Sequence, residues 1–370
     1  MRSHGAVVTF AEEDRMFRLM EMALNRHATR EGIDSIRYFF GQHADEGVAR
    51  LLRAADAAGV STEARAAIPA SGHWWTETTD ILVVESARIS GDDITRAPQR
   101  PSLIQKFGEV LDNIDTDAAR SLGIPVVPMR RRTMISCAEH VLGLMLALGR
   151  RLLVAHDGVA STARPAPQPE LAGGGSSVRF NWGDVSGIQV LDGRTLGLVG
   201  FGEVGRAVAV RAQALGMTVL YHRRTAAGTG WLPRALRDAR QVELEELLSC
   251  SDVVSIHVPE KEATMGMIDR SALSTMRSSA WLINISRGSI VDEKVLERAL
   301  RDGELAGAAL DVHHREPLPT DSGLIGVDNV VMTPHIASGG VDYVMREVDD
   351  LLGRVAAFEH RSGDQEGQRS

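Results

Sequence analysis

The chain has 370 residues, and its 41 Lys and Arg against 49 Asp and Glu give a formal net charge of −8. This acidic balance argues against a nucleic-acid partner, which would favour a basic face. Two cysteines, Cys137 and Cys250, show no metal-like or disulfide-like spacing and fit a reducing compartment. The N-terminus lacks the pattern of a signal peptide, and the densest apolar run, residues 141–148, is far too short to span a bilayer. We therefore expect a cytoplasmic, globular protein without a membrane partner.

The first part of the chain, up to about Pro128, alternates short apolar strands with helices. Residues 81–84 are one such predicted strand, and residues 45–58 are one such predicted helix. Residues 134–156 then predict one long helix. The segment that follows, residues 163–177, reads ARPAPQPELAGGGSS, which predicts an exposed connection without regular structure.

Residues 195–224 carry the most informative pattern, an apolar strand, a Gly-x-Gly-x-x-Gly turn, an amphipathic helix and a second apolar strand. Gly200 permits the tight turn, Gly202 lets the backbone approach a pyrophosphate, and Gly205 lets the helix pack closely on the sheet. The phosphates of a dinucleotide would lie at the helix N-terminus, where free N–H groups favour an anion. Glycine is frequent in turns of every kind, but the flanking strand and helix make this turn a predicted site for a nicotinamide dinucleotide.

The second strand of this unit ends without the acidic residue that would bind the ribose 2'-hydroxyl of NAD. Arg223, Arg224 and Thr225 stand there instead, and guanidinium groups suit a 2'-phosphate. The alternative interpretation is that arginine is simply common here, because lysine occurs only at positions 106, 261 and 294. We expect NADP(H) as the preferred cofactor, with NAD(H) possible.

Four further apolar segments, separated by helical stretches such as residues 292–301, complete a doubly wound parallel sheet: residues 253–257, 280–285, 308–311 and 330–332. The polar tail from Ser362 is expected to lack regular structure. Neighbouring His313 and His314 would point to opposite faces of a strand, so we predict no metal site.

Three polar residues follow these later strands, at the edge where an open α/β sheet binds its ligands. Arg287 can grip a carboxylate, His335 can exchange the proton of a hydroxyl–carbonyl couple, and Glu316 can hold the imidazole. Each has a plain alternative when taken singly: Arg287 could cap a helix, Glu316 could be loop surface, and His335 could be a turn residue.

Five segments in this order, GLVGFGEVGR, DVVSIHVPEKEATMGMID, INISRGSIVDE, GAALDVHHREPLP and VVMTPHIASGG, resemble the successive signatures of the D-isomer-specific 2-hydroxyacid dehydrogenases. The resemblance covers the chain from about Ile81 onward. It implies that Arg287 binds substrate and is catalytic, that His335 is the acid/base, and that Glu316 is its partner. It also implies a set of cofactor-binding residues: Gly200, Phe201, Gly202, Glu203, Val204, Gly205, Arg223, Arg224, Thr225, His257, Val258, Pro259, Ile285 and Asp311, the last at the nicotinamide carboxamide.

The resemblance implies two Rossmann-like domains with the active-site cleft between them. Residues 1–155 and 338–370 would form the substrate domain, residues 156–190 a connection, and residues 191–337 the NAD(P)-binding domain. Members of the family are usually homodimers, and the helix 134–156 would lie at that interface.

The segment LIQKFGEVLDNID resembles the substrate loop of the family and predicts substrate contacts at Gly108, Glu109 and Val110. Glu109 and Val110 stand where a small neutral residue and a glycine are usual, and an acid there should repel a carboxylate. One arginine of Arg130, Arg131 and Arg132 could neutralise Glu109. The alternative is that these arginines are solvated or form ordinary ion pairs.

The expected activity is NADPH-dependent reduction of a small 2-keto acid, such as glyoxylate or hydroxypyruvate, to a D-2-hydroxy acid. A different function on the same fold is a nucleotide-sensing, corepressor-like module that binds proteins. The presence of Arg287, Glu316 and His335 together favours catalysis. Formate dehydrogenases of the same superfamily fit less well, because they carry Gln where this chain has Glu316.

Overall fold

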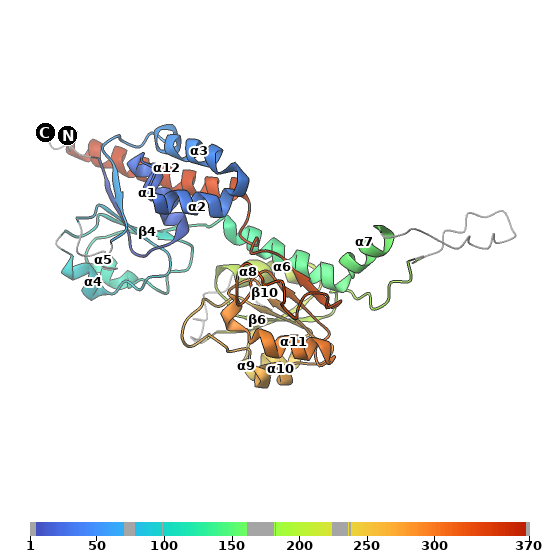
Figure 1. Cartoon of the computed structure of the whole chain (residues 1–370). Helices are drawn as coiled ribbons and strands as arrows, with labels where there is room; N and C mark the ends of the chain where they lie inside the picture. Colours follow the sequence, from blue (N-terminus) through green and yellow to red (C-terminus); the bar gives the residue numbers. More distant parts are fainter. Residues whose placement is uncertain are drawn as a thin grey trace, which may run out of the picture. The chain divides into compact units, whose positions relative to one another are not determined.

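The computed structural model describes residues 5–69, 78–97, 99–160, 181, 183–223, 236 and 238–367, the last five without their side chains (Figure 1). The chain divides into two compact units, Met1–Ser136 with Gly339–Ser370, and Cys137–Ser338. The described strands of the first unit form a five-stranded sheet and those of the second a seven-stranded sheet, and every strand pair in both is parallel. The predicted α/β class with two parallel sheets is confirmed.

The first unit has the strand order β2-β1-β3-β4-β5. Its strands are β1 (Val7–Phe10), β2 (Arg65–Ala67), β3 (Ile81–Val84), β4 (Leu103–Phe107) and β5 (Val126–Met129). Its helices are α1 (Arg15–Asn25), α2 (Arg30–Phe40), η1 (Gly41–His43), α3 (Ala44–Ala57), α4 (Gly91–Arg96), α5 (Thr116–Ser121) and α12 (Val341–Gly367). The predicted strand 81–84 is therefore confirmed, and the predicted helix 45–58 is displaced by one residue.

The C-terminal helix α12 belongs to this first unit, where it packs beside α1 and α3 (Figure 1). Its apolar residues recur every three to four positions, which places them on one helical face. The buried members of that face are Val344, Met345, Val348, Leu351, Leu352, Val355 and Ala356. Phe17 joins this core to the sheet, because its ring stacks on Phe10 at 4.8 Å and meets Phe107 edge-on at 5.4 Å.

The second unit has the strand order β12-β11-β10-β9-β6-β7-β8. Its strands are β6 (Thr195–Val199), β7 (Thr218–His222), β8 (Arg240–Gln241), β9 (Val253–Ile256), β10 (Trp281–Asn284), β11 (Gly307–Leu310) and β12 (Val330–Met332). Its helices are α8 (Glu203–Ala214), α9 (Leu244–Cys250), α10 (Arg270–Thr275), η4 (Gly288–Ile290) and α11 (Glu293–Arg301). The central strands are buried at every position, as expected for a parallel sheet covered on both faces.

The predicted single helix 134–156 is wrong, because the structure has two helices, α6 (Thr133–Gly149) and α7 (Leu152–Ala160). Arg151 between them has a φ of 53°, in the left-handed region, which ends the first helix. The Gly149 carbonyl accepts a hydrogen bond from Gln189 N at 2.7 Å instead of continuing the helical ladder. Cys137, Val141 and Met145 of α6 are buried in the core of the second unit.

The expectation for the tail is also corrected, since α12 continues past Ser362 to Gly367. The predicted connection 163–177 lies outside the described residues. None of the described helices combines the length and the apolar character that a membrane crossing requires.

Candidate active site

The glycine turn lies between β6 and α8 at the centre of the seven-stranded sheet. Gly200 has a φ of 99°, and a Cβ there would lie 2.6 Å from the His257 carbonyl oxygen, so only glycine fits. A Cβ at Gly205 would lie 2.5 Å from the Gly200 carbonyl oxygen. Gly202 differs, because a Cβ there would meet nothing within 4 Å. The turn thus leaves open space at the N-terminus of α8, where a pyrophosphate fits.

Other predicted cofactor-binding residues lie in the turn itself, at the start of α8 and at the end of the neighbouring strand β7. Phe201 is buried and its ring stacks on Tyr221 of β7 at 3.8 Å, while Glu203 and Val204 open α8 and are half-buried. Arg223 follows β7 and is half-buried. Arg224 and Thr225 lie outside the described residues.

His257, Val258 and Pro259 follow β9, the strand that pairs with β6. Burial lowers the pKa of His257 to about 3, so this ring stays neutral at physiological pH. Its Nε2 lies 2.9 Å from the Ser255 hydroxyl oxygen. Val258 is half-buried and Pro259 is exposed, and Ile285 after β10 is buried.

Arg287 follows β10 and is exposed, with its guanidinium donating to the Ser286 carbonyl oxygen at 2.7 Å. The Arg287 backbone is held by the end of β10, since the Asn284 side-chain amide donates to the Arg287 carbonyl at 2.9 Å. A Cβ at Gly288 would lie 2.0 Å from the His313 carbonyl group. Glycine is therefore needed for the Arg287 loop to lie against the loop that follows β11.

His335 and Glu316 meet through a hydrogen bond between Nδ1 and Oε2, at 2.8 Å. Glu316 follows β11 and His335 follows the neighbouring strand β12, and the backbone N–H of His313 donates to the other Glu316 oxygen at 3.1 Å. Burial opposes ionisation of the Glu316 carboxyl, but the hydrogen bonds from His335 and His313 outweigh it, so the pKa of Glu316 lies below its usual value. A carboxylate therefore orients the His335 imidazole through its Nδ1 atom.

Asp311 is fully buried beneath the loop that carries His335. Its carboxylate accepts hydrogen bonds from the Thr333 hydroxyl at 2.6 Å and from the N–H groups of Ile336 at 2.9 Å and Ala337 at 2.8 Å. Burial raises the pKa of Asp311, but hydrogen bonds from His140, Thr333, Ile336 and Ala337 together bring it below the usual value. Asp311 therefore fixes the His335 loop.

The predicted substrate loop belongs to the first unit. Gly108 is buried with a φ of 136°, Glu109 is exposed and Val110 is half-buried. The nearby arginines are engaged with carboxylates of the same unit. Arg131 is paired with Glu85 and lies 3.8 Å from Glu347, and Arg132 is 3.0 Å from Asp350. Arg131 and Arg132 thus form the ordinary ion pairs of the alternative interpretation, while Arg130 is exposed.

Two residues that support the site were not predicted to do so. Thr333 and His140 both contact the Asp311 carboxylate, and the His140 ring nitrogen lies 3.0 Å from the Thr333 hydroxyl oxygen. His140 comes from α6, far away in sequence, so local pattern could not reveal this contact. Within the described ranges, no three His, Cys, Asp or Glu side chains form a group that could hold a metal ion.

Residues 142–337 match the family described as D-isomer specific 2-hydroxyacid dehydrogenase, NAD binding domain. An (S)-sulfolactate dehydrogenase of Chromohalobacter salexigens is 38% identical over 70% of this chain and 77% of its own length. A glyoxylate reductase of Korarchaeum cryptofilum is 34% identical over 72% of this chain and 76% of its own. A D-3-phosphoglycerate dehydrogenase of Methanocaldococcus jannaschii is 35% identical over 69% of this chain, but the match spans only 45% of that longer enzyme.

Proposed function

Because the chain belongs to the D-isomer-specific 2-hydroxyacid dehydrogenases, a family of NAD(P)-dependent oxidoreductases acting on small 2-keto and 2-hydroxy acids, we propose that it is an NADPH-dependent reductase of a small 2-keto acid. The observation that carries the proposal is the 2.8 Å hydrogen bond between His335 and Glu316 at the carboxyl edge of the sheet. A nucleotide sensor that only binds proteins would not need an imidazole held by a carboxylate.

The glycine turn would hold the dinucleotide. The open space at Gly202, the close approach at Gly200 and the start of α8 at Glu203 suit a pyrophosphate. The chemistry that a bound reduced nicotinamide supplies is a hydride for the keto carbon. We propose that Asp311 lies near the nicotinamide carboxamide. It also positions His335, because it fixes the loop that carries this residue.

His335 would donate the proton that the developing alkoxide needs. Glu316 keeps its charge, since its pKa lies below the usual value, and therefore stabilises the imidazolium form of His335 before the transfer. Arg287 is exposed and would bind the substrate carboxylate. Gly108, Glu109 and Val110 are the proposed substrate contacts of the first unit, which would act as the substrate domain.

Three observations support the finer assignments. Arg223 follows β7 where a 2'-phosphate would lie, which supports NADP(H) over NAD(H). Helix α7 has no buried residue, and its Leu152 and Leu153 are 50% and 51% exposed, which supports a homodimer that covers them. Neither Cys137 nor Cys250 forms a disulfide, which supports a reducing, cytoplasmic location.

A screen of 2-keto acids with NADPH and with NADH, read as loss of absorbance of the reduced cofactor, tests the proposal. We expect glyoxylate or hydroxypyruvate to be reduced, and His335→Ala to lower kcat by about 10²–10⁴ while cofactor binding persists. Near wild-type turnover in His335→Ala would contradict the assignment of His335 as the acid. Failure of every keto acid with both cofactors would refute the reductase.

A further inference from the structure

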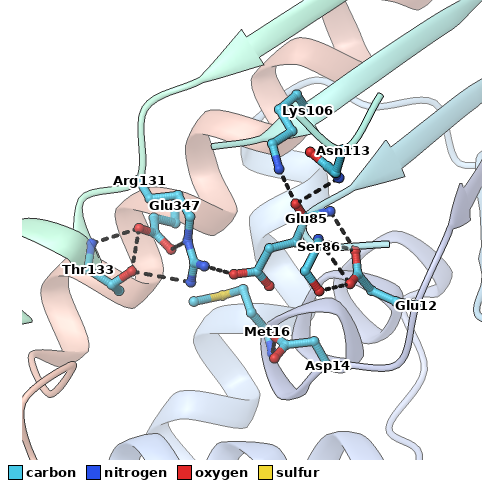
Figure 2. A network of polar contacts seen from close by, with 10 residues as sticks. All are labelled: Glu12, Asp14, Met16, Glu85, Ser86, Lys106, Asn113, Arg131, Thr133 and Glu347. Atoms are coloured by element: carbon cyan, nitrogen blue, oxygen red, sulfur yellow. Dashed lines mark hydrogen bonds and ion pairs between the residues drawn. The ribbon is translucent and has the colours of Figure 1, made fainter. Parts of the chain in front are cut away.

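Glu12 lies at the carboxyl edge of the five-stranded sheet, shortly after β1. Its carboxylate faces the turn that follows the neighbouring strand β3 and contains Glu85 and Ser86 (Figure 2). This edge is where an open parallel sheet binds its ligands. Glu12 and Ser86 are separated by more than seventy residues in sequence, so the contact comes from the strand order.

The Glu12 carboxylate accepts hydrogen bonds from both Glu85 and Ser86 (Figure 2). One oxygen accepts from Glu85 N at 2.6 Å and from Ser86 N at 2.7 Å. The other oxygen accepts from Ser86 N at 3.0 Å and from the Ser86 hydroxyl. Two successive backbone N–H groups with a hydroxyl beside them form a concavity that binds anions. Here a side chain of the same protein supplies the anion.

The turn is tied to the predicted substrate loop. The Glu85 carbonyl oxygen accepts from the Lys106 ammonium group and from the Asn113 side-chain amide, the latter at 3.3 Å. Asn113 also donates to the Ala87 carbonyl at 2.7 Å. Lys106 and Asn113 lie on either side of residues 108–110 in the chain. The turn that binds Glu12 is therefore hydrogen-bonded to residues on both sides of the segment proposed to contact substrate.

Arg131, which contacts the Glu85 side chain of this turn, is already paired with carboxylates. Arg131 stacks on Phe107 at 4.5 Å and is paired with the Glu85 carboxylate, and Glu347 lies 3.8 Å away on its other side (Figure 2). Glu347 is fully buried and is itself fixed by Thr133, whose N–H and hydroxyl donate to it at 2.7 and 2.8 Å. With two carboxylates already beside it, this guanidinium is poorly placed to attract a further anion.

We propose that Glu12 is a specificity-determining residue, whose carboxylate fills the anion site at Glu85 and Ser86 and so restricts the enzyme to 2-keto acids without a second anionic group. This inference rests on the proposed reductase function. A substrate with a distal sulfonate, phosphate or second carboxylate finds the donors occupied and meets the negative charge of Glu12. A distal hydroxyl or hydrogen meets neither obstacle.

The kinetic test compares hydroxypyruvate, which has one anionic group, with 3-sulfopyruvate, which has two. Glu12→Ala frees the three donors, so kcat/KM for sulfopyruvate relative to hydroxypyruvate should rise by about 10- to 100-fold, the range of one charge-assisted hydrogen bond. Glu12→Gln removes the charge but leaves one amide oxygen that can still accept from the Glu85 and Ser86 backbone N–H groups, so its gain should be much smaller. Glu13→Ala is the matched control, because Glu13 is exposed and forms an ion pair with Arg18.

The second test titrates inorganic sulfate into the wild type and the variants by calorimetry, without keto acid or cofactor. Glu12→Ala should bind sulfate at least tenfold more tightly than wild type, Glu12→Gln and Glu13→Ala. Equal sulfate binding in all four proteins, or an unchanged selectivity ratio in folded Glu12→Ala, would overturn the proposal. An equal gain in Glu12→Gln and Glu12→Ala would also overturn it, because charge alone would then suffice. Loss of the reductase function would appear instead as no turnover of either acid by wild type, and it would leave the sulfate result standing.

Discussion

Replacing Asp311 by asparagine changes the charge beneath the catalytic loop while leaving the side-chain volume nearly constant. One Asp311 oxygen accepts from Thr333 and Ile336, and the other accepts from Ala337. An asparagine can keep only one acceptor oxygen, so at least one buried donor faces an NH₂ group instead. Loss of a charge-assisted bond together with an unsatisfied buried donor predicts a loss of about 2–4 kcal/mol in unfolding free energy.

The same change should reduce activity, because the fixed loop carries His335. His335 has a φ of 57°, in the left-handed region, which costs a residue other than glycine roughly 1–2 kcal/mol. The bonds to Asp311 hold the loop in this conformation. Since a displacement of about 1 Å at a reacting group can cost about 10²-fold in rate, we expect kcat to fall by a similar factor while KM changes less.

The pH dependence supplies a direct check on the charge. The pKa of Asp311 is depressed in the folded protein, so its stabilisation is present above the ordinary carboxyl pKa and is lost as pH falls through the lower folded value. Denaturant unfolding of wild type and Asp311→Asn should therefore differ most near pH 7 and converge below about pH 4. Asp321→Asn, at an exposed position, serves as control and should stay within about 0.5 kcal/mol of wild type. Equal stability and kcat of wild type and Asp311→Asn, or a difference that does not change with pH, would refute this reasoning.

Three further predictions concern the partner of the acid, the cofactor and the assembly. Glu316→Gln should lower kcat less than His335→Ala does, because the ring keeps a hydrogen-bond partner but loses the carboxylate; equal kcat in Glu316→Gln and wild type would count against the pair. Arg223→Ala should weaken NADPH binding by about 10- to 100-fold and barely change NADH binding, as measured by fluorescence titration, and Arg223→Asp should favour NADH; a wild type that binds both equally would contradict the preference. Leu153→Asp should shift the mass measured by light scattering toward the monomer, and a wild type that is already monomeric would contradict the dimer.

The second unit was predicted well because its signals are local. The strands β9 and β10 are apolar at nearly every position, as burial on both faces requires. Within the glycine turn, the close approach of Gly205 to the Gly200 carbonyl is local, whereas Gly200 also lies against His257 after the neighbouring strand β9. His335 and Glu316 were expected as partners from their places after successive strands, and the structure brings them within 2.8 Å. Their catalytic roles stay a prediction.

The break between α6 and α7 was missed because it depends on a distant partner. Residues 134–156 are helical by pattern, and Arg151 gives no local sign of a left-handed conformation. The Gly149 carbonyl leaves the helical ladder for Gln189, which lies beyond the segment 161–180. A hydrogen bond between residues so far apart in sequence cannot be predicted from the helical periodicity.

The charged residues at the sheet edge of the first unit show the same limit more sharply. The sequence suggested that one arginine of the run Arg130 to Arg132 pairs with Glu109, because both segments were expected near the substrate. No sequence pattern pointed to a role for Glu12. The fold decides otherwise: the strand order brings Glu85 to Arg131 and Glu12 to the turn after β3, and helix α12 brings Glu347 to Arg131. Arg131 therefore pairs with a carboxylate that the fold brings to bonding distance, and not with Glu109. If Glu12 controls substrate choice, a determinant of specificity therefore lies before Ile81, in the part of the chain that resembles its family least.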